Sequence, residues 1–222
     1  MHQKISYEIF SKRGKLHEKQ GKENEDAINV VTNGDYIFAI LSDGAGSGPL
    51  PKMSSQCTVD EVGKVCSNYS NELFCTNEQL EMMVFKLQSA LEKIAYKNGY
   101  KLKDMMATLI IFGINIKSKE YITIHVGDGL VAEKNNKNWE ILSYPENKIS
   151  SKYTFFPNSS EVFDHLRVKR GIIEKNSAFF ISTDGFYENC TTTKQFLNQI
   201  QNKNINSILD DVSYCKVVIN DL

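Results

Sequence analysis

Two runs of apolar and β-branched residues near the beginning of the chain predict a pair of strands. Residues 26–31 (DAINVV) and 36–41 (YIFAIL) are separated by Thr32-Asn33-Gly34-Asp35. Asn-Gly between two such runs favours a β-hairpin, because both residues tolerate positive φ. We therefore expect these two strands to pair antiparallel.

Apolar positions then recur every three to four residues, which is typical of amphipathic helices. Two helical patterns follow the hairpin, and the second is the clearer one. Thr76 and Gln79 have the spacing of a capping box, and Asn98-Gly99 is a typical helix stop. We expect this helix to bury one stripe, formed by Leu80, Met83, Val84, Leu87, Leu91 and Ile94.

The second half of the chain returns to strand-like patterns. We expect strands at residues 106–116, 121–126, 130–133, 139–142, 162–168, 178–182 and 212–219, and a helix at 193–201. Residues 144–161 are polar with two prolines and predict an irregular excursion. Strands, a block of helices and strands again indicate an α+β fold with largely antiparallel sheets, and no linker divides residues 1–222.

Composition excludes several classes of protein. With 41% hydrophobic and 24% charged residues, the 222-residue chain is typical of a globular domain with a sizeable core. A net charge of −1 provides no field that would attract nucleic acid or an anionic membrane, so neither is an expected partner. The basic stretch at residues 1–22 is typical of a solvated face.

The cysteines and the apolar runs indicate a cytoplasmic protein. The five cysteines are odd in number and form no C-x-x-C pair, which favours reduced thiols over a disulfide framework or a zinc site. The first ten residues, MHQKISYEIF, contain no apolar signal core, and no later run approaches the roughly 18 apolar residues of a membrane span.

Acidic residues stand repeatedly at the ends of predicted strands. An apolar strand runs directly into Asp-Gly three times, at Asp43-Gly44, Asp128-Gly129 and Asp184-Gly185. A single Asp-Gly usually marks only a turn. The pairs Glu25-Asp26 and Asp210-Asp211 also stand directly before predicted strands. This repetition predicts that carboxylates from several strands converge on one rim of the sheets.

Grouped carboxylates point to a particular chemistry. Like charges in a cleft repel unless a cation neutralises them. Oxygen ligands without a His/Cys cluster favour Mg²⁺ or Mn²⁺ over zinc. A bridging carboxylate allows two ions about 3.5–4 Å apart, which lower the pKa of a bridging water and produce a hydroxide for in-line attack on phosphorus. The carboxylates therefore predict hydrolysis of phosphate esters.

The order of these motifs resembles the metal-dependent protein phosphatases of type 2C, and most closely their compact bacterial branch. The matching segments are GKLHEKQGKENEDAINV (14–30), FAILSDGAGSGPL (38–50), MMATLIIFGIN (105–115), ITIHVGDGLV (122–131), FFISTDGFYE (179–188) and DDVSYCKVVI (210–219). The resemblance implies one type 2C-like domain over residues 1–222. Its fold would be a four-layer α/β/β/α sandwich of two mainly antiparallel sheets flanked by helices.

The resemblance also implies roles for individual residues and two Mn²⁺ or Mg²⁺ ions. Asp43 would bridge both ions, with the Gly44 carbonyl joining it at the second ion. Glu25 would reach that second ion through water, and Asp184 and Asp210 would hold the first. Asp211 stands where many relatives have asparagine, and we interpret Asp26 and Asp211 as residues that either support these ligands or are structural.

Further positions either extend or depart from the family pattern. Asp128 would hold a weaker third ion together with Asp184. Gly21 stands where many relatives have a phosphate-binding arginine, and Ala45 stands where some have a histidine that protonates the leaving group. The missing positive charge would come from His17, Lys22, Lys19 or Arg13; we expect His17 and Lys22 to contact phosphate. His125 lies within a strand pattern and is interpreted as a core residue.

The function that the resemblance implies is serine/threonine protein phosphatase activity in signalling. The substrate would be phosphoserine or phosphothreonine on a partner protein, with a cognate serine/threonine kinase as a further partner, and we expect a monomer. Two alternatives stay open: a catalytically weak or silent phosphoprotein-binding scaffold of the same fold, and a phosphomonoesterase for small molecules.

Overall fold

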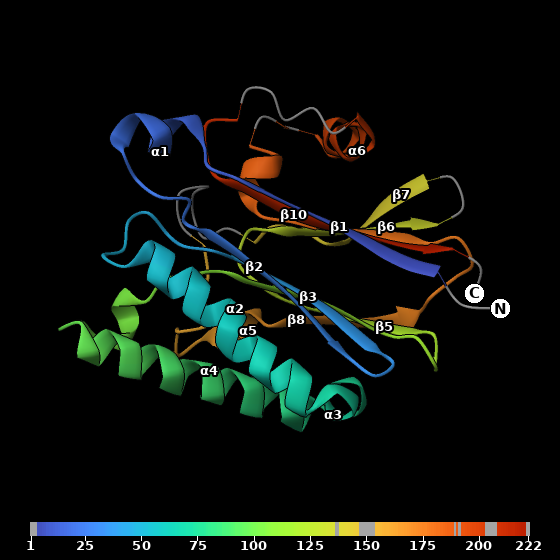
Figure 1. Ribbon diagram of the computed structural model, residues 1–222, viewed down its shortest axis with the longest axis horizontal. Helices are drawn as coiled ribbons and strands as arrows, with labels where there is room; N and C mark the ends of the chain where they lie inside the picture. The colour runs from blue at the N-terminus through green and yellow to red at the C-terminus, as the bar shows by residue number, and fades with distance from the viewer. Residues whose placement is uncertain are drawn as a thin grey trace.

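Two five-stranded sheets lie face to face in the computed structural model, which describes residues 4–135, 138–146, 154–188, 190, 192–202 and 208–220 (Figure 1). The first sheet has the order β1 (Lys4–Lys12), β10 (Val212–Asn220), β9 (Ala178–Ser182), β6 (Leu130–Asn135) and β7 (Asn138–Ser143). The second has the order β2 (Asp26–Asn33), β3 (Tyr36–Asp43), β4 (Leu109–Asn115), β5 (Glu120–Val126) and β8 (Arg167–Ile172). All neighbouring strands pair antiparallel, which confirms the predicted α+β class.

Helices cover both outer faces of the two sheets (Figure 1). The second sheet is covered by α2 (Pro51–Asn68), α3 (Ser70–Cys75) and α4 (Asn77–Lys97), with the short α5 (Val162–His165). On the other side lie α1 (Lys15–Gln20) and α6 (Thr193–Asn202). Two short 3₁₀ helices, η1 (Leu102–Asp104) and η2 (Asp184–Phe186), complete the elements. The architecture is therefore the expected four-layer sandwich.

Each pair of neighbouring layers encloses its own hydrophobic cluster. Strands of the second sheet bury Phe38, Ile40 and Ile111 against α2 and α4. Leu41, Phe112 and Phe179 lie between the sheets. Phe180, Phe196 and Tyr214 lie between the first sheet and α6. Because the central strands have apolar neighbours on both faces, they read as continuous apolar runs and not as alternating ones.

The predicted hairpin determines where Asp43 points. β2 and β3 pair in register from Asp26–Asp43 to Asn33–Tyr36, and Gly34 occupies the turn with φ 57°. Side chains alternate between the two faces of a strand. Ala39 and Leu41 face the layer between the sheets, so Asp43 continues on that side at the strand end. The sheet geometry thus directs the first expected metal ligand between the sheets.

The predicted helix after residue 76 is present, although its cap differs from the expectation. α4 buries Leu80, Met83, Val84, Leu87 and Leu91, as its periodicity indicates. Thr76 stands at the N-cap with extended backbone, but its side chain makes no capping hydrogen bond. The capping-box prediction is therefore wrong. Packing of the apolar stripe stabilises this helix without a side-chain cap.

Two further elements differ from the sequence prediction. Residues 162–168 were expected to form one strand, but α5 occupies their first half and β8 begins only at Arg167. Val162 and Leu166 both pack on the α2–α4 side, and their spacing of four fits a helical turn. β1 and α1 lie in the basic stretch and were not predicted. β1 is an edge strand whose Tyr7 and Ile9 are exposed, so backbone pairing with β10 stabilises it more than burial does.

All five cysteines are free. No helix in the described part of the chain is long and apolar enough to cross a membrane. Within the predicted excursion at 144–161, residues 147–153 lie outside the described residues.

Candidate active site

Carboxylates from separate strand ends meet at one end of the sandwich. Asp43 ends β3, Asp128 follows β5 and Asp184 follows β9. Ligand oxygens of these three residues all lie within 4.8 Å of one another. Asp210 precedes β10 and lies close enough for its charge to raise the pKa values of Asp43 and Asp184, although burial is the larger cause for both. The structure thus brings together four of the five predicted carboxylate ligands.

Close backbone approaches explain the glycines in these Asp-Gly pairs. None of Gly44, Gly129 and Gly185 has positive φ, so a left-handed turn is not the reason for glycine. A Cβ atom on Gly44 would lie 2.2 Å from the carbonyl oxygen of Pro51, and one on Gly185 would lie 2.0 Å from that of Asp211. Glycine is needed because another chain segment passes directly over the strand end.

Thr108 fixes the backbone at Asp43. The Asp43 amide donates to Thr108 Oγ1 at 3.0 Å, and the Thr108 amide donates to the Asp43 carbonyl at 2.8 Å. Ser42 Oγ also donates to the Thr108 carbonyl at 2.6 Å. The backbone of this strand end is therefore satisfied locally, which leaves the Asp43 carboxylate directed at the other acids. Sequence reasoning assigned no role to Thr108.

Burial and mutual repulsion perturb the acids strongly. Burial, with the nearby charges of Asp184, Asp26, Asp128 and Asp210, raises the pKa of Asp43 well above its usual value. Burial likewise raises the pKa of Asp184 well above its usual value and that of Asp128 to about 6. In a group of this kind each carboxylate disfavours the charge of its neighbours. The cluster therefore favours bound protons or bound cations.

Asp26 is a fully enclosed member of the same group. Its Oδ2 accepts a hydrogen bond of 2.9 Å from Thr183 Oγ1, which links the two sheets. Its Oδ1 is buried and has no hydrogen-bond partner among the described residues. Burial raises its pKa to about 7. Asp26 thus stands beside the cluster as a buried carboxylate that is bonded to the opposite sheet.

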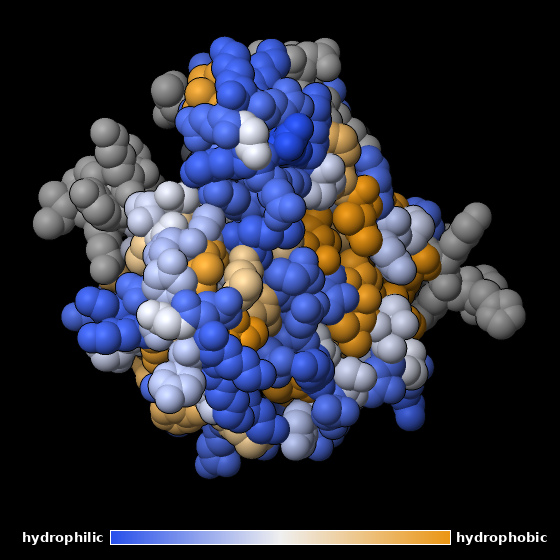
Figure 2. Space-filling view, turned by 60° about the vertical axis from the view of Figure 1, so that its left-hand side comes forward, coloured by the Kyte–Doolittle hydropathy of each residue, from blue (hydrophilic) through white to orange (hydrophobic). Residues whose placement is uncertain are grey.

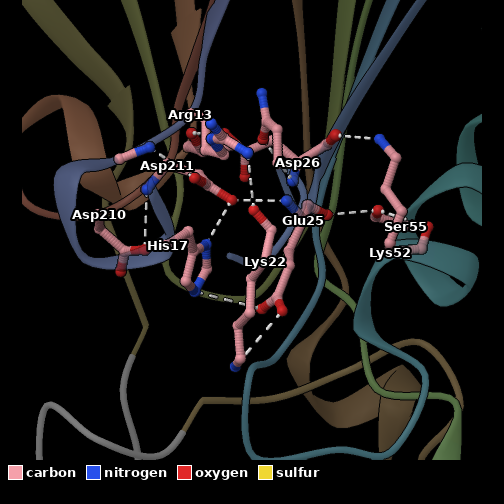
Figure 3. Close-up of polar contacts among 12 residues, drawn as sticks. Arg13, His17, Lys22, Glu25, Asp26, Lys52, Ser55, Asp210 and Asp211 are labelled. Atoms are coloured by element: carbon pink, nitrogen blue, oxygen red, sulfur yellow. Dashed lines mark hydrogen bonds and ion pairs between the residues drawn. The ribbon is translucent and has the colours of Figure 1, made fainter. Parts of the chain in front are cut away.

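Asp211 connects the amino-terminal segment to the beginning of β10 (Figure 3). Its carboxylate accepts hydrogen bonds from the amides of Gly14 at 2.7 Å and Glu25 at 2.5 Å, and contacts His17 Nδ1 at 2.8 Å. Residues nearly two hundred positions apart are thereby held together. Asp211 orients both Glu25 and His17 without belonging to the three-carboxylate cluster.

Glu25, His17 and Lys22 form a charged group beside the cluster (Figure 3). His17 Nε2 lies 3.6 Å from Glu25 Oε2, and Lys22 Nζ lies 3.6 Å from Glu25 Oε1. Glu25 is buried, and its Oε2 lacks a hydrogen-bond partner in the described part of the chain. The Glu25 carbonyl accepts from the Gly44 amide at 3.2 Å, so this group is joined to the end of β3.

Several residues of the site were missed from the sequence. The Tyr187 hydroxyl donates to the Asp128 carbonyl, and Glu188 accepts from the amides of Leu209 at 2.7 Å and Asp210 at 3.1 Å. Both residues follow Asp184-Gly185 in the segment FYE, which was the available signal. Arg167 donates to the Gly127 carbonyl at 2.6 Å and thereby supports the turn before Asp128.

His125 contributes to the core, as expected. Its side chain is completely buried, and Nδ1 lies 2.8 Å from Ser143 Oγ. Burial, with the nearby charge of Arg167, lowers its pKa well below the usual value. His125 is thus a neutral histidine within the protein interior and not a phosphate contact.

The acids fit a hard divalent cation on several grounds. The donor set consists of oxygen atoms, which Mg²⁺ and Mn²⁺ prefer. Buried oxygens of Glu25 and Asp26 lack hydrogen-bond partners in the described structure. Burial first, and the neighbouring carboxylates second, raise the pKa values of Asp43 and Asp184, and a bound cation would offset both effects. These features match the chemistry that the sequence predicted.

Several solved structures share this fold. RsbX in complex with magnesium is 15% identical, with a TM-score of 0.64 and coverage of 97% of this chain and 96% of that chain. The S. agalactiae serine/threonine phosphatase is 15% identical, with a TM-score of 0.68 and coverage of 96% and 99%. The catalytic domain of the serine/threonine phosphatase PstP with two manganese ions is 12% identical, with a TM-score of 0.66 and coverage of 98% and 99%.

Sequence comparison adds the family to this likeness of fold. No curated protein sequence matches the chain. The family model described as protein phosphatase 2C matches residues 13–213, which include all of the carboxylates discussed above. The chain therefore belongs to the protein phosphatase 2C family.

Proposed function

We propose that the protein is a divalent-metal-dependent phosphatase that hydrolyses phosphoserine or phosphothreonine on a partner protein. The observation that carries this proposal is the convergence of Asp43, Asp128 and Asp184, whose ligand oxygens lie within 4.8 Å of one another. Three separate strands supply these acids, and burial of the group is costly unless cations bind there. Family membership supports the same reaction.

The proposed ligands are those that the sequence predicted. Asp43 would contact both proposed Mn²⁺ or Mg²⁺ ions, the Gly44 carbonyl would join it at the second ion, and Asp184 and Asp210 would hold the first. Glu25 would act on the other side, and a weaker third ion would be held at Asp128 and Asp184. When bound, such ions neutralise the carboxylates and lower the pKa of a coordinated water to provide a nucleophile for phosphorus.

The chain's own residues would position the phosphate group. His17 and Lys22 each place a nitrogen 3.6 Å from the Glu25 carboxylate, at the border of the acidic cluster. We propose that these side chains contact phosphate oxygens, in place of the arginine that many relatives have at the position of Gly21. Asp211 holds His17 in this orientation through its contact with Nδ1 at 2.8 Å. The Nε2 atom is thereby directed toward the reacting side of the site.

The proposal also includes the setting of the enzyme. Residues 1–222 would form one phosphatase domain that acts as a monomer in the cytoplasm, in signalling with a cognate serine/threonine kinase. The free cysteines support a reducing compartment. PstP and the S. agalactiae phosphatase, which share the fold, are described as serine/threonine phosphatases and support this class of substrate.

The test is turnover by the purified chain after removal of metal with EDTA. We expect release of phosphate from phosphoserine and phosphothreonine peptides only when Mn²⁺ or Mg²⁺ is restored. Asp43→Asn should lower kcat by at least about a hundredfold, because loss of a central ligand removes several kcal/mol of transition-state stabilisation. Asp35→Asn is the matched control, since Asp35 is exposed in the turn at the other end of the same hairpin.

Three results would contradict the proposal. Turnover that is unaffected by EDTA would exclude the metal-dependent reaction. Tight binding of phosphopeptides with no turnover in either metal would indicate a scaffold instead of an enzyme. Turnover of small phosphate esters without turnover of any phosphopeptide would indicate a phosphomonoesterase.

A further inference from the structure

A groove of about 520 Å³ opens beside Glu25, outside the carboxylate cluster. Pro49, Leu50, Pro51 and Met53 provide its apolar wall, and Lys22 and Lys52 also line it. Figure 2 brings forward the side of the molecule on which α1 and the beginning of α2 lie, where apolar residues interrupt a mostly hydrophilic surface. The apolar wall of this groove is not used by the phosphate chemistry described above.

The groove has a firm wall. Proline fixes φ, so Pro49 and Pro51 restrict the loop that enters α2. Leu50 packs against the core below, and Ser54 donates to its carbonyl from both the amide at 2.9 Å and Oγ at 2.7 Å. Met53, in the first turn of α2, is 39% exposed to solvent. The apolar side chain of Met53 is therefore accessible on a preformed surface, which reduces the entropy lost when a ligand binds.

Hydrogen bonds join this wall to the acidic residues (Figure 3). Ser55 Oγ donates to the Glu25 carbonyl at 2.5 Å, and Lys52 Nζ donates to the Asp26 carbonyl at 2.8 Å. Lys22 Nζ lies 3.6 Å from Glu25 Oε1 on the groove side. Glu25 consequently belongs both to the groove and to the charged group beside the cluster. The two sites form one continuous surface.

We propose that the groove is a specificity subsite for an apolar side chain that flanks the phosphorylated residue of the substrate. This inference rests on the proposed function and extends it, with Met53 as the specificity-determining residue. In this proposal the phosphate group lies at the carboxylate cluster, and the flanking part of the peptide passes Glu25 on its way out of the site. Lys22 and Lys52 carry positive charges that complement the phosphate group and the backbone carbonyls of the peptide. The next surface that it reaches is apolar. The occupant is therefore a substrate chain and not a second copy of the enzyme.

The experiment is a substrate scan with the 222-residue protein in Mn²⁺. Phosphoserine peptides carry alanine at every flanking position, and leucine is then placed at one position at a time. We expect leucine at one position to raise kcat/KM by about tenfold over alanine, mainly through KM, since added methylene groups in an apolar pocket give discrimination of this size. Aspartate at that position should give no gain.

Variants of Met53 assign the preference to the groove. Met53→Gln has similar size and no charge, and should reduce the leucine preference to about twofold or less, whereas Met53→Leu should keep it. Tyr96→Gln is the control, because it removes an exposed hydrophobic side chain from another helix: Tyr96 lies on α4 and is 83% exposed to solvent. Turnover of a generic aryl phosphate, which has no flanking residues, should be the same in wild type and Met53→Gln.

The outcomes separate this inference from the proposed function. Equal kcat/KM for all peptides, with aryl phosphate turnover intact, would overturn the subsite and leave the phosphatase in place. A leucine preference that survives Met53→Gln would also overturn it. If Met53→Gln sediments differently from wild type but has the same peptide kinetics, the groove mediates self-association and the subsite is overturned as well. If nothing is hydrolysed, the phosphatase proposal fails. Equilibrium binding of the labelled leucine and alanine peptides then decides the subsite, and equal affinities overturn it.

Discussion

A matched pair of threonines provides a quantitative test of how the site is held together. Thr183 and Thr58 are each only 1% exposed, so the same change to valine removes a buried hydroxyl in both places. Thr183 Oγ1 donates to Asp26 Oδ2 at 2.9 Å and accepts from the Ser213 amide at 3.0 Å. Thr58 Oγ1 has no hydrogen-bond partner in the described part of the structure. The two hydroxyls differ in partners and not in burial.

The expected free energies follow from those partners. Thr183→Val leaves one buried carboxylate oxygen and one buried amide without a partner, at about 1–3 kcal/mol for each. We expect a loss of about 2–4 kcal/mol, which for a chain of this length lowers Tm by about 5–15 °C. Thr58→Val removes a hydroxyl that is already unpaired, so stability should stay constant or rise by about 1 kcal/mol.

The measurement is urea unfolding followed by far-ultraviolet circular dichroism, in EDTA so that metal binding does not contribute. Midpoints and slopes are compared among wild type and the two variants. Equal losses in both variants would show that loss of volume or strain, and not hydrogen bonding, determines the cost. A Thr183→Val variant within about 0.5 kcal/mol of wild type would refute the role assigned to the bond between Thr183 and Asp26.

Three further predictions concern packing, pH and metal. Gly185→Ala should destabilise the protein by several kcal/mol in thermal unfolding, because the added Cβ would lie 2.0 Å from the Asp211 carbonyl oxygen. Gly99→Ala is the control: nothing lies within 4 Å of its added Cβ, so this variant should lose only about 1–2 kcal/mol, because alanine is strained at the positive φ of this position. The pKa of His125 is lowered well below 6.5, so below pH 6.5 the unfolded chain binds a proton at this residue that the native protein does not. The contribution of His125 to stability should therefore fall by up to about 1.4 kcal/mol per pH unit as the pH drops, and urea titrations at each pH should show that His125→Gln loses less stability than wild type over the same range. Mn²⁺ at about a hundred times its Kd should stabilise the protein by about 2.7 kcal/mol in thermal scans, and an unchanged Tm in wild type, or an equal gain in Asp184→Asn, would contradict metal binding at the cluster.

Local patterns in the sequence were sufficient for most of the elements. The hairpin at β2 and β3 follows from Asn33-Gly34 between apolar runs, and α4 follows from the apolar stripe that repeats from Leu80 to Ile94. Both signals depend on residues that are neighbours in the chain. β1 was missed because pairing with β10, at the other end of the chain, stabilises it. The strand expected at 162–168 was wrong because tertiary packing selected a helical turn for its first half.

The sequence by itself determined which acids stand at strand ends, and the order of motifs indicated the family to which the chain belongs. It could not determine how close they come, because Asp43, Asp128 and Asp184 are brought together by two different sheets. Only the tertiary structure assigned the glycines after these acids to close backbone contacts, and only it revealed Thr108, Thr183 and Tyr187 as supports. The physical reason is that burial, repulsion and hydrogen bonds across the sheets depend on distances between segments far apart in the chain, which no local pattern encodes.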